Sequence, residues 1–466
     1  MTEANVSAGL AGRGGAAAGG ASGVSLPANV RELEDVVARA LEVARAAGAT
    51  GAEIGLGVDA GLSVSVRLGE VESLEYQRDR GLGVTVYVGQ RKGSASTGDL
   101  SPAAVAETVR KAVSIASFTA EDPCAGLPDR ADLAVDIPDL DLAHLWPVSA
   151  EEAVEIARRC EAAALAVDKR LVNSEGGSVS THAGLRVFGN SHGFLASYPG
   201  THHTISCSVL GQEGEDMQRD YWYTTSRDWR SLEDAEAVGR VAGERTVRRL
   251  GARRLATCKA PVLYVPELAR GLVGHFLGAI RGGAQYRESS FLLGAAGETL
   301  FPSFVQLFER PHLPGALGSA PFDAEGVATH DRDWVRDGVL QGYVLDTYSA
   351  RRLGLRTTGN AGGTHNLRVA PGTADLEGLL RQMGRGFMVT ELLGQGVNGV
   401  TGDYSRGASG FWVEGGEIAF PVHEVTIAGN LREMYRRVVA IGSDVDTRGS
   451  LQTGSWLLEE MTIAGE

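Results

Sequence analysis

The chain has 466 residues, enough for two or three domains of about 100–200 residues each. Apolar residues make up 43% of the sequence and charged residues 22%, so the chain can bury a hydrophobic core without disulfides. Acidic side chains number 58 and basic ones 44, and the resulting net charge of −14 argues against a nucleic-acid or membrane partner.

The four cysteines are widely spaced and form no C-x-x-C pair. This spacing excludes a zinc ribbon or a thioredoxin-type motif and predicts free, buried thiols. The N-terminus lacks the basic region and Leu/Val-rich segment of a signal peptide, and no stretch approaches the ~18 consecutive apolar residues of a membrane span. We therefore expect a cytoplasmic protein.

The predicted elements begin after a Gly/Ala-rich tail at residues 1–26, which we expect to be disordered. An N-terminal α+β domain is predicted at 27–122. Its first helix starts at the cap Asn29, where Glu32 completes a plausible capping box, and runs to about Ala47. Alternating strand segments follow, and a second helix opens at Ser101. The spacing predicts an antiparallel sheet with helices packed on it.

A central α+β domain is predicted at 123–255, entered through a proline-rich linker. It holds a helix at 149–167, strands near 170–192 and 203–226, and a helix at about 231–250 capped by Ser231. Residues 256–466 form a C-terminal domain of glycine-punctuated strands and loops. The predicted fold class is α+β, with mostly antiparallel sheets, packed helices and a glycine-rich, strand-dominated C-terminal domain. The 63 glycines show no collagen-like period, so they predict tight turns and bulges.

The segment 265–283, VPELARGLVGHFLGAIRGG, predicts a helix that carries a family resemblance. It resembles the TldD/PmbA metallopeptidases, whose catalytic member has a helical H-E-x-x-x-H motif that binds zinc. On this chain the motif falls on residues 270–275. Arg270 stands at the first histidine, Gly271 at the glutamate, and His275 alone keeps its position.

Further blocks are similar to the PmbA (TldE) branch of this family. They are QYRESSFLL (285–293), GSAPFDAEGV (318–327), DGVLQGYVLDTYSARRLGLRTTGNAGG (337–363) and TGDYSRGASGFWVEGGEI (401–418). The resemblance covers roughly residues 30–460.

The resemblance implies a zinc site in the family, but this chain departs from it. A catalytic zinc needs about three protein ligands and an open position. The family's catalytic member also uses a late cysteine, and this chain has none after Cys258. The degenerate motif at Arg270, Gly271 and His275 therefore predicts no metal, no cofactor and no catalytic residue in this chain. The resemblance places the zinc in a TldD-like partner.

The resemblance also implies a heterodimer, or a larger complex, whose enclosed chamber cleaves small peptides or unfolded segments. Candidate residues for the chamber or for substrate contact are Arg270, His275, Tyr286 and Arg287. Arg270 could bind a peptide carboxylate or lie on the helix surface. His275 could be a retained polar group or an ordinary half-buried histidine, and Tyr286 and Arg287 could line the chamber or a subunit interface.

Two alternative functions remain open in the sequence. An independent hydrolase with a non-zinc centre would need a nucleophile–base pair, for which Ser405 or Ser409 near His423 is the candidate. A regulatory binding protein is the other alternative. The G-x-G-x-x-G match at 394–399 does not precede a predicted helix, which argues against a dinucleotide site. His202 and His203 are predicted to lie in a surface loop.

Overall fold

The computed structural model describes residues 24–26 and 28–465. The predicted tail at 1–26 therefore lies almost wholly outside the described residues. Val24, the first described residue, packs against an apolar cluster that contains Trp146.

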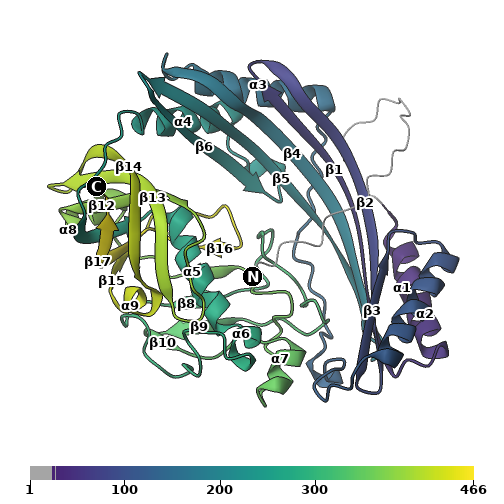
Figure 1. Ribbon diagram of the computed structural model, residues 1–466. Helices are drawn as coiled ribbons and strands as arrows, with labels where there is room; N and C mark the ends of the chain where they lie inside the picture. Colours follow the sequence, from purple (N-terminus) through teal and green to yellow (C-terminus); the bar gives the residue numbers. More distant parts are fainter. Residues whose placement is uncertain (1–23, 27, 466) are drawn as a thin grey trace.

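Six antiparallel strands form one long, strongly curved sheet (Figure 1). Their order is β3-β2-β1-β4-β5-β6. The strands are β1 (Gly51–Arg67), β2 (Glu70–Val88), β3 (Arg91–Thr97), β4 (Leu171–Asn190), β5 (Leu195–Glu213) and β6 (Asp216–Ser226). The pairing of β1 with β4, for example Ile54 with Gly189, joins strands that the sequence assigns to two domains. The predicted domain limits themselves stay predictions.

Four helices cover the convex face of this sheet, two at each end (Figure 1). They are α1 (Val30–Ala46) and α2 (Pro102–Phe118) at one end, and α3 (Ala150–Leu165) and α4 (Ala235–Arg248) at the other. The even-numbered residues of β1 from Ile54 to Val66 are buried under these helices. The concave face of the sheet is turned toward the rest of the chain.

Side-chain caps define where these helices begin. The Asn29 side chain accepts a hydrogen bond from the Arg31 N–H in the first turn of α1. Ser101 caps α2 in the same way, and Ser149 forms a full capping box with Glu152 on α3. The predicted start of the fourth helix is wrong. Ser231 ends a short 3₁₀ turn, and Asp234 caps α4 by accepting from two backbone N–H groups.

The C-terminal part contains a small closed barrel. Strand order is β14-β13-β12-β7-β17-β15, and β14 also pairs with β17, so that five of these strands form a ring. The strands are β7 (Cys258–Tyr264), β12 (Gly386–Leu393), β13 (Asp403–Glu414), β14 (Glu417–Asn430), β15 (Val438–Ile441) and β17 (Trp456–Ala464). All neighbouring pairs are antiparallel except β7 with β12.

A second, smaller sheet of short strands packs beside the barrel. Its strands, in order, are β10 (Val339–Leu340), β9 (Arg332–Arg336), β8 (Leu307–Glu309), β11 (Leu367–Val369) and β16 (Leu451–Gln452). The helices of this part are α5 (Pro266–Ile280), α6 (Gly282–Tyr286), α7 (Thr347–Arg352), α8 (Leu376–Met383) and α9 (Leu431–Arg436). One face of α5, including Leu272 and Phe276, is buried in a core that also contains Trp334 and Trp456. The predicted α+β class is confirmed.

The proline-rich segment 123–148 is packed between the curved sheet and the C-terminal part. Leu140, Leu142 and Trp146 are buried. The Leu142 carbonyl accepts from the Thr201 N–H at 2.9 Å, and the Leu140 carbonyl accepts from the Gly315 N–H at 2.8 Å. The segment thus tethers the two parts in addition to connecting them.

Helix packing on the convex face predicts a steric requirement at Gly239 of α4. A Cβ there would lie 2.0 Å from the Cys160 carbonyl oxygen of α3. We expect Gly239→Ala to lower the free energy of unfolding by about 2 kcal/mol, since overpacking forces the helices apart. The matched control is Gly274→Ala on α5, where a Cβ meets no atom within 4 Å. This control should gain up to about 1 kcal/mol from helix propensity. Urea unfolding of the two variants measures the difference, and a stable Gly239→Ala chain would contradict the packing.

Candidate functional site

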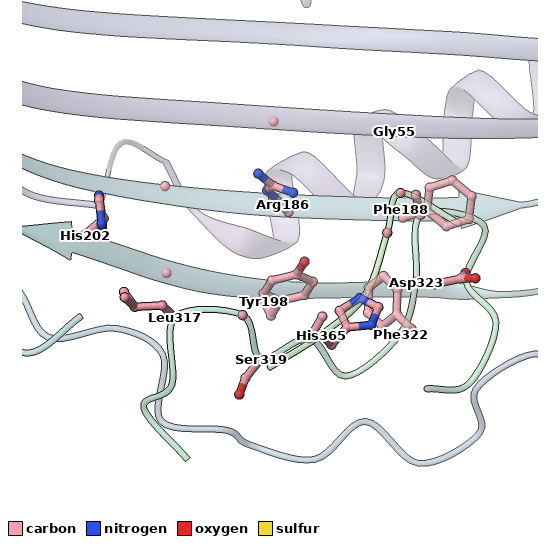
Figure 2. A pocket seen from close by; sticks show the side chains of 18 of the residues that line it. Gly55, Arg186, Phe188, Tyr198, His202, Leu317, Ser319, Phe322, Asp323 and His365 are labelled. Atoms are coloured by element: carbon pink, nitrogen blue, oxygen red, sulfur yellow. The ribbon is translucent and has the colours of Figure 1, made fainter. Parts of the chain in front are cut away.

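A cavity of about 740 Å³ lies between the concave face of the curved sheet and loops of the C-terminal part (Figure 2). Strands β1, β4 and β5 form one wall, and residues 317–324 and 361–365 form the other. A second cavity of about 430 Å³ shares His202, Arg227 and Leu317 with the first and extends to Arg448. The two cavities make one recess between the two parts of the chain.

Small and polar residues line the sheet wall because successive strand residues point to opposite faces. On β1, odd-numbered positions such as Gly55, Gly57 and Asp59 line the cavity. On β4 the corresponding residues include Gly184 and Arg186. Several glycines therefore lie inside strands, where the missing side chain widens the recess, and not only in the predicted turns and bulges. The sequence signal was a polar or glycine residue at every second strand position.

His202 and His203 lie within β5, so their predicted place in a surface loop is wrong. His202 lines the cavity, with its Nε2 2.7 Å from Thr225 Oγ1. His203 is buried on the other face, where its ring nitrogens lie 2.8 Å from Thr181 Oγ1 and from the His144 carbonyl. Burial lowers the pKa of both imidazoles.

Carboxyl groups gather near one end of the cavity. Asp323 lines it and accepts hydrogen bonds from three backbone N–H groups at 2.9 Å each. Glu53 on β1 accepts a hydrogen bond from the Tyr87 hydroxyl at 3.3 Å. Burial, reinforced by the charge of Glu325, raises the pKa of both Glu53 and Asp323 to about 7. The junction of the sheet with the C-terminal part thus holds carboxyl groups that bind protons near neutral pH.

The exposed face of α5 is made largely of glycine. A Cβ at Gly271, Gly274 or Gly278 would meet no atom within 4 Å. His275, beside this face, is half-buried, and its ring centroid lies 6.2 Å from that of Tyr404. Burial lowers the pKa of His275, and the nearby charge of Arg406 lowers it further.

Arg270 belongs to an ion cluster. Its guanidinium lies 3.2 Å from the Asp446 carboxylate and 3.3 Å from the Tyr223 hydroxyl. Asp446, whose side chain is 4% exposed, also pairs with Arg448 at 2.9 Å, and Arg448 pairs with Glu267 at 3.3 Å. The cluster ties α5 to β6 and to the loop before β16. Arg270 therefore already has a carboxylate partner within the chain, and its predicted contact with a peptide stays a prediction.

Tyr286 and Arg287 lie at the end of α6 and are not among the residues that line the two cavities. The Arg287 Nη1 donates to the Tyr286 hydroxyl at 2.8 Å, and the guanidinium sits 5.1 Å above the Tyr286 ring. The Tyr286 ring packs edge-on against Tyr348 of α7. The structure brings these two candidates together, but their described contacts do not reach Arg270 or His275.

The residues of the alternative hydrolase lie on two neighbouring strands of the barrel. Ser405 is exposed and Ser409 buried in β13, and His423 lies in β14. Within residues 24–26 and 28–465, no hydrogen bond joins either hydroxyl to His423. The segment 394–399 leads from β12 toward β13, so it does not open a helix as a dinucleotide site would.

The described part of the chain contains no group of three or more His, Cys, Asp or Glu side chains that could hold a metal ion. None of its helices is both long and apolar enough to cross a membrane.

Three family models match the chain in sequence order. They are the PmbA/TldA metallopeptidase domain 1 at residues 52–116, the central domain at 143–250 and the C-terminal domain at 257–465. The chain belongs to the PmbA/TldD metallopeptidase family.

Similar proteins place the chain on the PmbA branch of that family. It is 52% identical to metalloprotease PmbA of Escherichia coli O157:H7 over 434 residues, which cover 93% of this chain and 96% of the relative. It is 47% identical to the PmbA homologue of Haemophilus influenzae over 441 residues, which cover 94% and 98% of the two chains. A crystal structure from Bacteroides thetaiotaomicron, described as a candidate modulator of DNA gyrase, superposes with a TM-score of 0.89 at 28% identity, covering 93% and 99%. The resemblance inferred from the sequence is confirmed.

The ion cluster around Asp446 predicts a large loss of stability for Asp446→Asn. Burial raises the pKa of Asp446, but the Arg448 hydrogen bonds and the Arg270 charge outweigh it and hold the pKa below its ordinary value. The variant leaves two guanidinium groups without their buried partner, so we expect a cost of about 3 kcal/mol at pH 7. Because the folded pKa is depressed, the deficit should shrink only as the pH falls below about 4. Urea titration of this variant and of Asp136→Asn, an exposed aspartate, provides the measurement, and equal effects would contradict the prediction.

The raised pKa of Glu53 predicts that stability falls as the pH rises from about 4.5 to about 7. In this window the folded state retains a proton that the unfolded state has released. Glu53→Gln removes the cost of ionising this group, so its melting temperature should exceed that of the unmodified chain at pH 8. The difference should narrow at pH 5, where the folded carboxyl is protonated. Thermal melts at both pH values test this, with Glu70→Gln on the exposed start of β2 as the control. A difference that does not change with pH would contradict the assignment.

Proposed function

We propose that this chain is a non-catalytic subunit that completes a zinc metallopeptidase, and that a TldD-like partner supplies the metal. The proposal rests on the residues that α5 carries at the zinc-motif positions. At the zinc-motif positions of the family, this helix presents a paired arginine, a glycine and one half-buried histidine.

These three residues do not fit a zinc ion. Arg270 is permanently charged and is held by Asp446, so it repels a cation and offers no lone pair. Gly271 has no side chain with which to activate a water molecule. His275 is a single imidazole near the Arg406 cation, whereas a catalytic zinc needs about three protein ligands. The chain's own α5 therefore supports a structural role for this subunit.

The recess between the curved sheet and the C-terminal part suits an extended peptide. Its sheet wall carries small and polar residues, which leave space and offer hydrogen-bonding groups. The edge strands β3 and β6 could also pair with an extended substrate, as strand addition requires. We propose that the complex degrades or matures small peptides and unfolded segments, either as a heterodimer or as a larger assembly.

The proposed setting is the cytoplasm, which the state of the thiols supports. Cys124, Cys160, Cys207 and Cys258 are all free cysteines. Reduced thiols are the normal state in a cytoplasmic protein.

The proposal is tested by measuring metal content and peptide hydrolysis on the chain alone and with a TldD-like subunit. The chain alone should hold no stoichiometric zinc and cleave no peptide. Together with a subunit that carries an intact H-E-x-x-x-H, it should copurify and hydrolyse an unstructured peptide, because the partner supplies the ligands and the base.

The matched control is the same partner with the first histidine of its motif changed to alanine. That complex should still assemble but show no hydrolysis. Stoichiometric zinc on the isolated chain, peptide hydrolysis without the partner, or failure to copurify would each contradict the proposal.

A further inference from the structure

Arg227 lies where the two cavities meet, and its charge is not matched by a carboxylate. It follows β6 and lines both cavities. Its Nε donates to the Ala316 carbonyl at 2.9 Å, its Nη2 to the Leu317 carbonyl at 2.8 Å, and its Nη1 to the Thr201 carbonyl at 3.4 Å. No ion pair of Arg227 occurs among the residues that the structure describes. A guanidinium has five N–H donors, so two remain available.

The groups near Arg227 include a second cation, Arg186, and an imidazole, His202. Burial lowers the pKa of Arg227, and the Arg186 charge lowers it further while Tyr198 opposes the shift. Arg186 is exposed on β4 and has no described ion-pair partner, and His202 lies on the neighbouring strand β5 (Figure 2). Arg227 is half-buried and has no carboxylate partner among the described residues, so its charge is partly desolvated, and a bound anion would relieve that cost.

The acidic residues of the cavity leave this charge largely uncompensated. Asp59 on β1 and Asp323 are the carboxylates that line it. Asp323 is buried and bound by backbone N–H groups, and its pKa near 7 keeps its charge partial at neutral pH. The Asp59 side chain lies against Gly184: a Cβ added at Gly184 would be 2.2 Å from Asp59 Oδ1. Asp59 forms no ion pair among the described residues.

We propose that Arg227 and Arg186, with His202, form a carboxylate-binding subsite that holds the carboxylate end of a peptide in the recess. Arg227 is anchored by three carbonyl groups, so its remaining donors are fixed in direction. Arg186 supplies a second, exposed cation from β4, which β5 separates from β6 in the sheet. Gly200 leaves the space for this arrangement, since a Cβ there would lie 3.0 Å from Arg227 Nη1. The subsite rests on the proposed function, because it assumes that the recess takes peptides.

The test is direct binding of labelled peptides to the full-length chain, followed by fluorescence anisotropy. Two unstructured peptides of one neutral sequence are compared, one with a free C-terminal carboxylate and one with a C-terminal amide. We expect the free acid to bind about tenfold more tightly, as a charge-assisted, bidentate contact predicts. A third peptide, amidated but ending in glutamate, distinguishes a side-chain carboxylate from the terminal one, and tight binding of it also supports the subsite.

Arg186→Gln and Arg227→Gln should each reduce the acid-to-amide preference about tenfold. Arg227→Lys keeps the charge but loses the forked geometry, so it should restore only part of the preference. Arg186→Gln keeps the test valid if Arg227→Gln misfolds, because the Arg186 side chain has no described hydrogen bond to lose. The control is Arg110→Gln, which removes the same charge from the exposed side of α2 on the convex face and should leave the preference unchanged.

Equal affinity for the acid and the amide would overturn the subsite while leaving peptide binding in place. Failure to bind either peptide would overturn both the subsite and the peptide-binding role. A tenfold acid preference in a chain that does not copurify with a zinc subunit would support the subsite and reject the proposed complex. An acid preference that survives in both Arg186→Gln and Arg227→Gln would show that other residues bind the carboxylate.

Discussion

The antiparallel pairing of β1 with β4 is the constraint on which the rest of the structure depends. It runs from Glu53–Asn190 to Val66–Gly177 and makes one sheet from two segments more than a hundred residues apart. Every second residue along these strands then faces the helices, and the others face the C-terminal part. A register shift of one residue would place Ile54 and Leu56 in the recess and Asp59 under the helices. The apolar alternation of β1 therefore determines both the core and the composition of the cavity wall.

Local structure could be predicted from the sequence, and long-range structure much less so. The helices α1, α2 and α3 follow from apolar spacing and caps, and α5 from its sequence segment; all four begin within a residue or two of the expected positions. Ser231 misled the prediction because it ends a 3₁₀ turn, and Asp234, three residues later, caps α4 in its place. Nothing local shows that β1 pairs with β4 and not with a strand of its own segment. The recess was missed for the same reason, since Arg186, Arg227 and the loop at 317–324 meet only after that pairing.

The buried and open faces of helix α5 have separate roles in the structure. The apolar side, with Leu272 and Phe276, is buried in the large C-terminal core and fixes the helix whatever its other face carries. On the open face, glycines remove side chains, and Arg270 is drawn into the cluster with Asp446 and Arg448. Arg270 on this helix joins α5 to β6 and to the loop before β16. The sequence showed Arg270 and Gly271 at the motif positions, but it did not show the ion cluster that Arg270 joins.

Arg270 and Arg448 differ from Arg227 in one physical respect: carboxylates neutralise the first two, and none pairs with Arg227 among the described residues. Arg270 and Arg448 share the Asp446 carboxylate, and Arg448 also pairs with Glu267, so two carboxylates compensate the two charges and a ligand would have to compete with them. Arg227 is fixed only by carbonyl groups, which orient its guanidinium without neutralising it. An anion or water that completes the environment of such a partly desolvated charge stabilises it. The open cavity beside Arg227 provides room for either, and a peptide carboxylate has the planar geometry that the two remaining donors match. Substrate selection in the recess would then depend on Arg227, outside the degenerate zinc motif.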